Sequence, residues 1–207
     1  MQKLKLKEAL DEIRKAKERK FEQSIDLIIN LKGIEAKRDN VNVILTIPHK
    51  IKEKKVCAFL NSKSDFVDTI KEPDFAKYKD KKVLKNLVKN YDFFIAAAPL
   101  MPKVATTFGK ILGPAGKMPS PQLGILMQEN EASIKSTLEK ISKSIKIRVK
   151  EASVKIVAGK EKMKDEEITE NIEAIYKGIE NALPKKRDNI KNLMIKLSMG
   201  SPVKVEV

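Results

Sequence analysis

Residues 108–124 form the segment whose composition is best suited to carry chemistry. They include four glycines and three prolines but only two charged residues, in a chain rich in lysine. Glycine adopts backbone angles closed to other residues, whereas proline fixes its own φ and restrains the residue before it. We therefore predict an ordered, shaped loop here, because such loops carry function when a rigid scaffold positions them.

Two loops that bind phosphate or nucleic acid can be compared with this segment. A P-loop requires Gly, four residues and then Gly-Lys-Ser/Thr, so that amides hold the phosphates and the hydroxyl meets magnesium. Here Met118 follows Gly116-Lys117, and Ile111 stands where the first glycine belongs, which argues against an NTPase. Gly113-Pro-Ala-Gly116 matches the GxxG loop with which a KH domain clamps a nucleic-acid backbone. That tetrapeptide is short and its proline lacks a donor, so a structural turn that caps a helix is the competing interpretation.

The charge balance predicts a polyanionic partner. The 207 residues carry 43 Lys and Arg against 28 Asp and Glu, a formal net charge of +15, which favours RNA, DNA or an acidic membrane surface. A merely soluble basic protein is the alternative. The chain has no Trp, three Tyr and seven Phe, which disfavours a single-strand binder built on base stacking. Recognition of a folded nucleic acid through its backbone and shape fits better.

Other kinds of site are poorly supported. Cys57 is the only cysteine, so no disulfide or zinc site is expected within the chain, and its apolar surroundings predict a buried position. His49 is the only histidine, which excludes a multi-histidine metal site, and we expect no cofactor. The N-terminus lacks an apolar signal core, and no run approaches the roughly 20 apolar residues of a membrane span. We expect a soluble intracellular protein with no membrane partner.

Hydrophobic periodicity divides the chain into three parts. Near the two ends, alternating apolar residues predict strands, together with amphipathic helices over 4–20 and 165–183, the second capped by Asp165. In the middle, the unbroken apolar runs 56–60 and 93–98 lie between helical patterns, as in parallel strands covered on both faces. The pattern predicts an α+β open-sheet domain formed by both termini and an inserted α/β domain, with a single mixed domain as the alternative. The remaining expected elements are strands at 25–31, 41–47, 145–149, 154–158, 193–197 and 203–207, and helices at 81–91, 99–112 and 130–142.

Several motifs together resemble a known family. The sequence Gly109-Lys-Ile-Leu-Gly-Pro-Ala-Gly-Lys-Met-Pro-Ser-Pro121 is similar to the signature of the large-subunit ribosomal protein L-one family, the proteins of the mobile stalk. Lys20-Phe21-Glu22, Ile47-Pro48-His49 and Ser198-Met199-Gly200 match further segments in the same order. The resemblance covers nearly the whole chain, and the length and Lys/Glu-rich composition are typical of the archaeal branch.

This resemblance implies a fold and a function. The expected fold has a discontinuous α+β domain over 1–50 and 143–207 and an inserted Rossmann-like α/β domain over 51–142. The implied protein is a non-enzymatic, cytoplasmic component of the large ribosomal subunit that binds rRNA in the mobile stalk near the tRNA exit site. The implied further partners are tRNA and the mRNA of its own operon, whose translation it would repress, and the free protein would be a monomer.

The resemblance also implies where RNA binds. Glycine at 200 would permit close backbone approach, Ser198 would reach a 2′-hydroxyl, Phe21 and Met199 would pack on sugars or bases, and lysines would meet phosphates. The alternatives are that Phe21 staples a helix to the sheet and that Met199 and Gly200 form only a hairpin turn. The implied RNA-binding residues are Lys20, Phe21, Ser24, Lys160 after Gly159, Lys196, Ser198, Met199 and Gly200, and the inserted-domain loop contributes Gly109, Lys110, Gly113, Gly116 and Lys117.

Two departures from the family pattern bear on these positions. Ala115 stands where the family has arginine, so that charge is absent or is supplied by Lys117. The family's Thr-Met-Gly-Pro reads Ser198-Met-Gly-Ser-Pro202, with an added residue before the proline. The other hypotheses are a general basic nucleic-acid-binding protein, predicted by charge alone, and an enzyme that uses 108–124 on a phosphorylated substrate.

Overall fold

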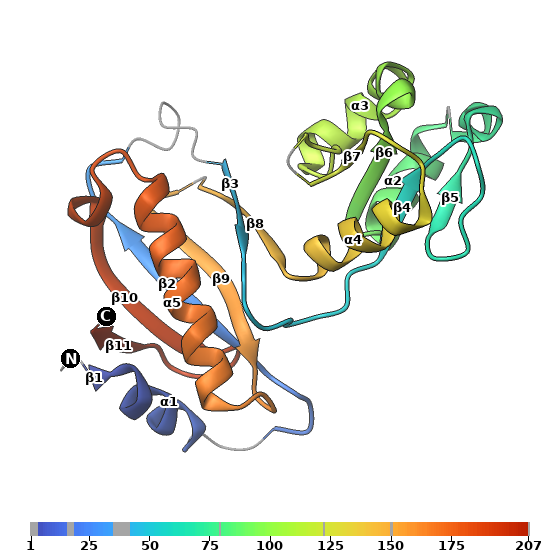
Figure 1. The fold of residues 1–207 in the computed structure, drawn as a ribbon. Coiled ribbons are helices and arrows are strands. Elements are labelled where there is room, and N and C mark those ends of the chain that lie inside the picture. Colours follow the sequence, from blue (N-terminus) through green and yellow to red (C-terminus); the bar gives the residue numbers. More distant parts are fainter. Residues whose placement is uncertain are drawn as a thin grey trace. The chain divides into compact units, whose positions relative to one another are not determined.

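A computed structural model describes residues 4–15, 19–34, 42–78, 80–121, 123–149 and 151–206. The chain divides into two compact units, Met1–Ile51 with Lys143–Val207, and Lys52–Ser142. Each unit combines strands with helices (Figure 1), so the predicted mixed α/β class is confirmed. We call them unit 1 and unit 2 and describe each by itself.

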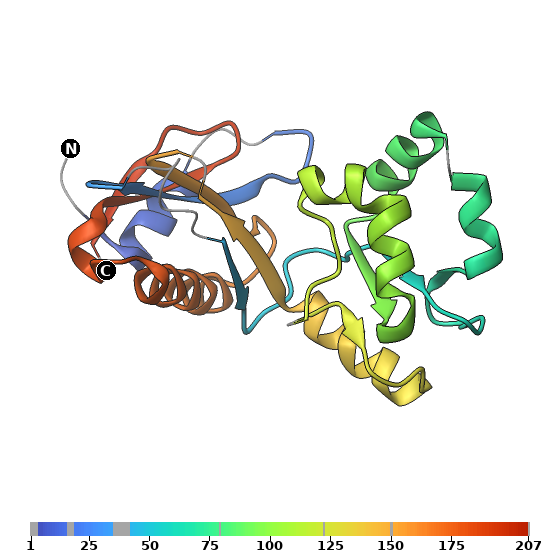
Figure 2. The same cartoon turned by 90° about the horizontal axis from the view of Figure 1, so that it is seen from above.

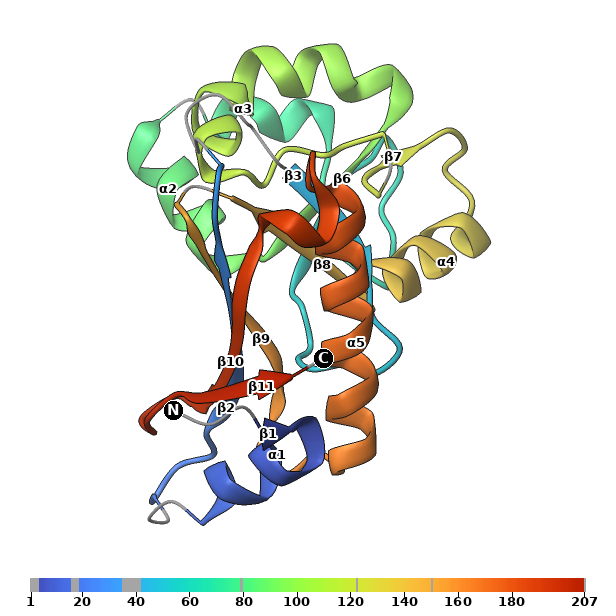
Figure 3. The ribbon, with the colours of Figure 1, turned by 90° about the vertical axis from the view of Figure 1, so that its left-hand side faces the viewer.

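Unit 1 is built on a five-stranded sheet with the order β1-β11-β10-β2-β9. The central strands β2, β9 and β10 are antiparallel, whereas the short β1 runs parallel to β11 at one edge (Figure 3). The helices α1 and α5 cover the same face of this sheet (Figure 2). The bounds are β1 Leu4–Lys5, α1 Leu6–Arg14, β2 Ser24–Leu31, β9 Ser153–Lys160, α5 Asp165–Ala182, β10 Ile190–Leu197 and β11 Val203–Glu206.

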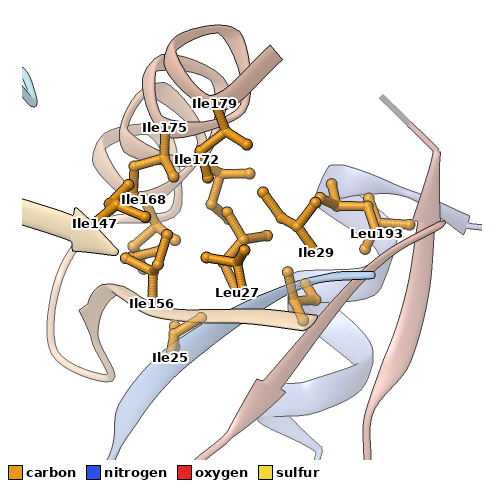
Figure 4. Close-up of a cluster of buried hydrophobic side chains, with 14 of the residues drawn as sticks. Ile25, Leu27, Ile29, Ile147, Ile156, Ile168, Ile172, Ile175, Ile179 and Leu193 are labelled. Atoms are coloured by element: carbon orange, nitrogen blue, oxygen red, sulfur yellow. The ribbon is translucent and has the colours of Figure 1, made fainter. Parts of the chain in front are cut away.

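Strict alternation in β2 separates a packed face from an open one. Ile25, Leu27 and Ile29 are fully buried and face the isoleucines of α5 (Figure 4). The alternate residues Ser24, Asp26, Ile28 and Asn30 are only half-buried. Burial of each isoleucine or leucine stabilises the fold by about 1.5–3 kcal/mol, so this pattern fixes the face on which the helices dock. The opposite face remains accessible to a partner.

Two expected features of the helices in unit 1 are wrong in detail. The helix predicted over 4–20 begins at Leu6 and ends at Arg14, because Leu4 and Lys5 pair with β11 instead. Part of the predicted stretch, 16–18, lies outside the described residues. Asp165 is the first residue of α5 and not its cap, and its carboxylate binds the guanidinium of Arg14. The acidic first turn of α5 is nevertheless where the helix dipole favours it.

A two-stranded ribbon completes unit 1. It pairs β3, Asn42–Thr46, with β8, Ser144–Arg148, in antiparallel register. These strands lie just before and just after the two points at which the chain passes between the units. The backbone N–H of Ile47 donates to the carbonyl of Lys143 at 2.7 Å, which joins the two segments at that place.

Unit 2 contains a parallel sheet with the order β5-β4-β6-β7. Its core includes the rings of Phe59, Phe94 and Phe108, with the centroids of Phe59 and Phe108 4.8 Å apart. The short strands β5 and β7 were not predicted, because two or three residues are too few to show a period. The bounds are β4 Val56–Phe59, β5 Asp68–Ile70, α2 Lys81–Asn90, β6 Phe93–Ala97, α3 Met101–Ala115, β7 Ile125–Leu126 and α4 Glu131–Ser142, with 3-10 turns Glu72–Tyr78, Ala98–Leu100 and, in unit 1, η3 Lys186–Asn189.

Cys57 lies in this second core, and its predicted burial is confirmed. Burial, with the carboxylate of Asp68 nearby, raises the pKa of the Cys57 thiol to about 12. The thiolate that nucleophilic chemistry needs is therefore not populated at neutral pH. Within the described part of the chain, no helix is both long enough and apolar enough to cross a membrane.

Two glycines of unit 2 give a matched test of packing. A Cβ on Gly124 would lie 2.9 Å from the Cα of Pro119 and 3.1 Å from the carbonyl oxygen of Phe94, both backbone atoms that cannot rotate away. We expect Gly124→Ala to lower the free energy of unfolding by about 2–3 kcal/mol.

The control is Gly109→Ala in the middle of α3, where an added Cβ meets no atom within 4 Å. Alanine is the better helix former, so this substitution should stabilise the protein by about 0.5–1 kcal/mol. Urea unfolding followed by circular dichroism measures both changes. Two substitutions with the same effect would contradict the close backbone approach at Gly124.

Candidate nucleic-acid interface

The RNA-binding residues predicted in unit 1 come together at one end of the five-stranded sheet. Ser24 opens β2 opposite Lys160, the last residue of β9. The N–H of Ser198, just beyond β10, donates to the carbonyl of Ser24 at 3.0 Å. Phe21 lies shortly before the start of β2, and Met199 follows Ser198 in the chain. Three segments that are far apart in the sequence thus meet at one end of the sheet, which we call the Ser24 end.

The Ser24 end exposes two large apolar side chains. Phe21 is 54% exposed and Met199 is 63% exposed, and neither belongs to the hydrophobic core. The interpretation of Phe21 as a staple between helix and sheet is therefore wrong. An exposed aromatic ring and an exposed thioether each offer a surface on which an unstacked base or a sugar can pack.

Gln23 organises this end, although the sequence reasoning missed it. Its side-chain oxygen accepts from the N–H of Met199 at 3.3 Å, and its own N–H donates to the carboxylate of Glu161 at 3.1 Å. Its carbonyl also accepts from the N–H of Glu161 at 2.9 Å. A signal was present, because position 23 has the same parity as the buried positions 25, 27 and 29, and Gln23 is indeed only 3% exposed.

Ser198 and Gly200 shape the turn that carries Met199. The hydroxyl of Ser198 donates to the carbonyl of Ser24 at 3.2 Å and accepts from the N–H of Ser24 at 3.3 Å. Its single proton is therefore committed, so toward a 2′-hydroxyl it can act only as an acceptor. The N–H of Gly200 donates to the carbonyl of Leu197 at 2.8 Å, which is the turn that the alternative interpretation predicted.

The cations of the Ser24 end differ in availability. The ammonium of Lys160 lies 3.0 Å from the carboxylate of Glu22 and is held there. Lys20 and Lys196 form no salt bridge with any residue that the structure describes. Lys196 stands opposite Asp26 on the open face, where burial raises the pKa of Asp26 and the lysine opposes that rise. Lys20 and Lys196 are therefore the lysines best placed to meet phosphates.

A β-bulge in β9 lies next to the Ser24 end, and it includes the position beside Gly159. Ile25 pairs with Gly159 and Asp26 with Val157, so Ala158 is an extra residue in β9. A Cβ on Gly159 would lie 2.9 Å from the side chain of Ile168 in α5. Gly159 thus serves the packing of the helix on the sheet, whereas its neighbour Lys160 reaches the surface.

Asn171 of α5 forms a hydrogen bond with the backbone of the bulge, and this role was not predicted from the sequence. It is fully buried, and its amide nitrogen donates to the carbonyls of Ala158 and His49, both at 3.1 Å. Its oxygen accepts from the N–H of His49 at 3.0 Å. The sequence offered one indication, because Asn171 is a polar residue on the same helix face as the apolar residues Ile168, Ile172 and Ile175. The motif Ile47-Pro48-His49 is thereby fixed to unit 1.

The segment 108–124 differs from the predicted loop. Its first half continues α3, which carries Gly109, Lys110 and Gly113 and ends at Ala115. Pro114 is tolerated in the last turn because Gly113 before it has no Cβ to meet the proline ring. Gly116 has a φ of 70°, and the N–H of Lys117 donates to the carbonyl of Leu112, which closes the helix as a Schellman motif. The interpretation as a turn that caps a helix is confirmed.

Lys117 has a structural role inside unit 2. Its ammonium donates to the carbonyls of Val88 and Tyr91, both at 2.7 Å, at the C-terminal end of α2. A cation satisfies orphan carbonyls there and complements the helix dipole. Lys117 is therefore not available for a phosphate in this conformation, in contrast to the exposed Lys110.

The carboxyl ends of the parallel strands in unit 2 are occupied by the protein itself. The strand order reverses between β4 and β6, the kind of point where open α/β sheets bind ligands. There the carboxylate of Glu129 accepts from the N–H groups of Asn61 at 3.0 Å and of Ser62 at 3.3 Å. Because these amides already hold an anion, the geometry argues against a phosphorylated substrate at this place.

Comparison with known proteins gives one consistent family. The model of the ribosomal protein L1p/L10e family matches residues 13–201. The protein named large ribosomal subunit protein uL1 from Pyrobaculum islandicum is 35% identical over 210 residues, 96% of this chain and 90% of the relative. Proteins of the same name from Pyrococcus horikoshii and Thermococcus kodakarensis are both 33% identical over 214 residues, 98% of this chain, and cover 95% and 97% of their own lengths.

Proposed function

The chain belongs to the ribosomal protein L1p/L10e family, in its archaeal type, and from this we infer that it is a structural protein of the large ribosomal subunit in the cytoplasm. It is not an enzyme, because the family consists of structural proteins. Its ligand is large-subunit rRNA. A net charge of +15 supports such a polyanionic ligand.

We propose that rRNA binds at the Ser24 end. The observation that carries this proposal is the exposure of Phe21 and Met199 in segments that meet at the Ser24 end, where Gln23 binds the N–H of Met199. Lys20 and Lys196 would neutralise phosphates, and the half-buried polar turn at Ser198 and Gly200 would receive the sugar–phosphate backbone. Lysines that bind phosphates do so whatever the base sequence, whereas a fixed turn accepts only a backbone of matching shape. Together these contacts suit a folded RNA.

Finer aspects of the function rest on the resemblance. We propose that the bound site is the mobile stalk near the tRNA exit site, that the protein also contacts tRNA there, and that it is a monomer when free. We further propose that the same surface binds the mRNA of its own operon and represses translation. If so, an rRNA fragment and that mRNA should compete for one site, and simultaneous binding of both would contradict a shared surface.

The two compact units are proposed to act as separate domains. Unit 1 would be the discontinuous α+β domain that carries most of the RNA affinity, and unit 2 a Rossmann-like inserted domain that adds secondary contacts, for example through Lys110. The segments near 50 and 143 would act as hinges. Small-angle scattering of the full chain should then fit several domain arrangements, and a single rigid shape with and without RNA would count against the hinges.

The experiment that tests the main proposal compares ligands at fixed physiological salt. The full chain is titrated with a stalk-type rRNA fragment, a random RNA of equal length and a DNA duplex of equal length. We expect the rRNA fragment to bind on the order of 10³-fold more tightly than the other two. Equal binding to all three, with affinity falling steeply as salt rises, would favour the charge-only hypothesis.

Ser198 gives a residue-level prediction. Ser198→Val removes the hydroxyl that holds the start of β2 against the Met199 turn, and it also removes an acceptor for RNA. We expect RNA affinity to fall by about 1–3 kcal/mol, which is about 5- to 150-fold in Kd. Ser198→Thr keeps the hydroxyl and serves as the control. An unchanged Kd for the valine variant would remove Ser198 from the site.

A further inference from the structure

A second basic feature lies at the end of the unit 1 sheet opposite to the Ser24 end. Strands β2 and β10 are antiparallel and eight residues long, so Leu31 and Ile190 lie together at the far end. At the rise of a β-strand, the two ends are roughly 25 Å apart. A pocket of about 190 Å³ extends from there toward the middle of β10, lined by residues of α5, η3, β10 and β11. We call it the Arg187 pocket.

The charged residues that line the Arg187 pocket are mostly cationic. Arg187, Lys191 and Lys204 line it from three different elements, and Glu206 is the only acidic residue that lines it among the described residues. None of the three cations forms a salt bridge within the part of the chain that the structure describes. Tyr176 of α5 also lines the pocket. A planar guanidinium, two ammonium groups and a hydroxyl are the groups that bind the oxygens of a phosphate.

The turn before the pocket is held in a fixed shape. Asn189 is 2% exposed, its oxygen accepts from the N–H of Lys185 at 2.7 Å, and its amide donates to the carbonyl of Lys32 at 3.0 Å. Lys186 has a φ of 48°, in the left-handed region that residues other than glycine seldom adopt. Such a conformation persists only where the surroundings impose it, and it concentrates at ligand sites. The side chains of Lys185, Lys186 and Lys32 are all exposed around this turn.

We propose that the Arg187 pocket binds a phosphodiester group of an RNA strand, as a second contact in the half of the sheet away from the Ser24 end. The volume is below the roughly 300 Å³ at which pockets begin to hold drug-sized ligands, so it suits one phosphate with part of its sugar. The exposed lysines beside it extend the basic surface beyond the pocket, which favours a polymer over a free phosphate ion. This inference rests on the proposed function, because it takes RNA as the ligand.

The test uses the full chain and two matched triple variants. Arg187→Gln, Lys191→Gln and Lys204→Gln together remove the cations of the pocket. Lys7→Gln, Lys15→Gln and Lys177→Gln remove the same charge from exposed positions in α1, directly after α1 and in α5 of the same unit. Kd for the stalk-type rRNA fragment is measured over a range of salt concentrations, and inorganic phosphate is titrated while backbone amides are followed by NMR.

We expect the pocket variant to bind the rRNA fragment about tenfold or more weakly than the control variant, with a salt slope lower by about one for each phosphate that the protein no longer neutralises. Phosphate should shift the amides of 187–191 and 204 in the wild type and the control but not in the pocket variant. Equal RNA affinities of the two variants would overturn the proposal. If phosphate nevertheless bound to the wild type and not to the pocket variant, the pocket would be a site for the free ion and not for RNA. Failure of the proposed function would give another result: the wild type itself would not bind structured RNA more tightly than other nucleic acids. RNA would then no longer be supported as the ligand of the pocket.

Discussion

Truncation of both exposed apolar side chains at the Ser24 end, Phe21→Ala with Met199→Ala, is expected to weaken rRNA binding by about 30-fold to 10⁴-fold. Stacking and packing of one base on such a side chain contributes about 1–3 kcal/mol, so the removal of two such side chains corresponds to this range. Both side chains are more than half exposed, and their removal should change the free energy of unfolding little. Titration of the rRNA fragment at fixed salt measures the effect.

Unit 2 supplies a control of the same chemistry. Phe66 is 44% exposed and Met127 is 86% exposed, so Phe66→Ala with Met127→Ala removes the same two residue types from another surface. We expect this double variant to bind rRNA within about twofold of the wild type, because neither residue belongs to the Ser24 end and surface truncations outside a site usually leave it unchanged. If both double variants weakened binding equally, the apolar side chains at the Ser24 end would not be the source of affinity.

Asn171→Leu is expected to have the largest effect on stability. Leucine has a similar size but leaves the carbonyls of Ala158 and His49 and the N–H of His49 without their present partner. An unsatisfied buried polar group costs about 1–3 kcal/mol, so we expect the free energy of unfolding to fall by about 3–5 kcal/mol. That is a large share of the 5–15 kcal/mol by which a typical domain is stable.

Amide hydrogen exchange tests where the destabilisation occurs. Protection should fall in β2, β9 and β10 of unit 1, whereas β4 and β6 of unit 2 should keep theirs. Asn192→Leu is the control, because this half-buried residue has one side-chain bond, to Asn30 at 2.6 Å, and removing it should cost less than about 1.5 kcal/mol. Equal protection in Asn171→Leu and the wild type would show that Asn171 does not hold the bulge.

The position of Lys117 illustrates why sequence reasoning about a site can go wrong while the elements are right. The glycines and prolines of 108–124 predicted a shaped loop, but the first half continues α3 and the turns come after it, from Gly116. Two carbonyls at the end of α2, more than 25 residues earlier in the chain, hold the ammonium of Lys117. A composition argument cannot see such a partner, because the lysine is recruited by tertiary contact and not by any local pattern.

The sequence by itself determined the central elements of the sheets, the packed helices and the family. Alternation of apolar residues decides which face of β2 is buried, because the side-chain period of a strand is two, and burial of each large residue outweighs local preferences. The motifs around Phe21, His49 and Met199 determined the family, because their order and spacing are specific. These signals are local, so they can be read along the chain.

Only the tertiary structure decided which polar groups are free and which are committed. Ser198 is bound to Ser24, Lys160 to Glu22 and Lys117 to α2, whereas Lys20 and Lys196 form no salt bridge among the described residues. The bulge at Ala158 and its partner Asn171 likewise depend on groups that meet through folding. The physical reason is that a hydrogen bond or ion pair needs an approach within about 3–4 Å, and such approaches join segments that the sequence separates by many tens of residues.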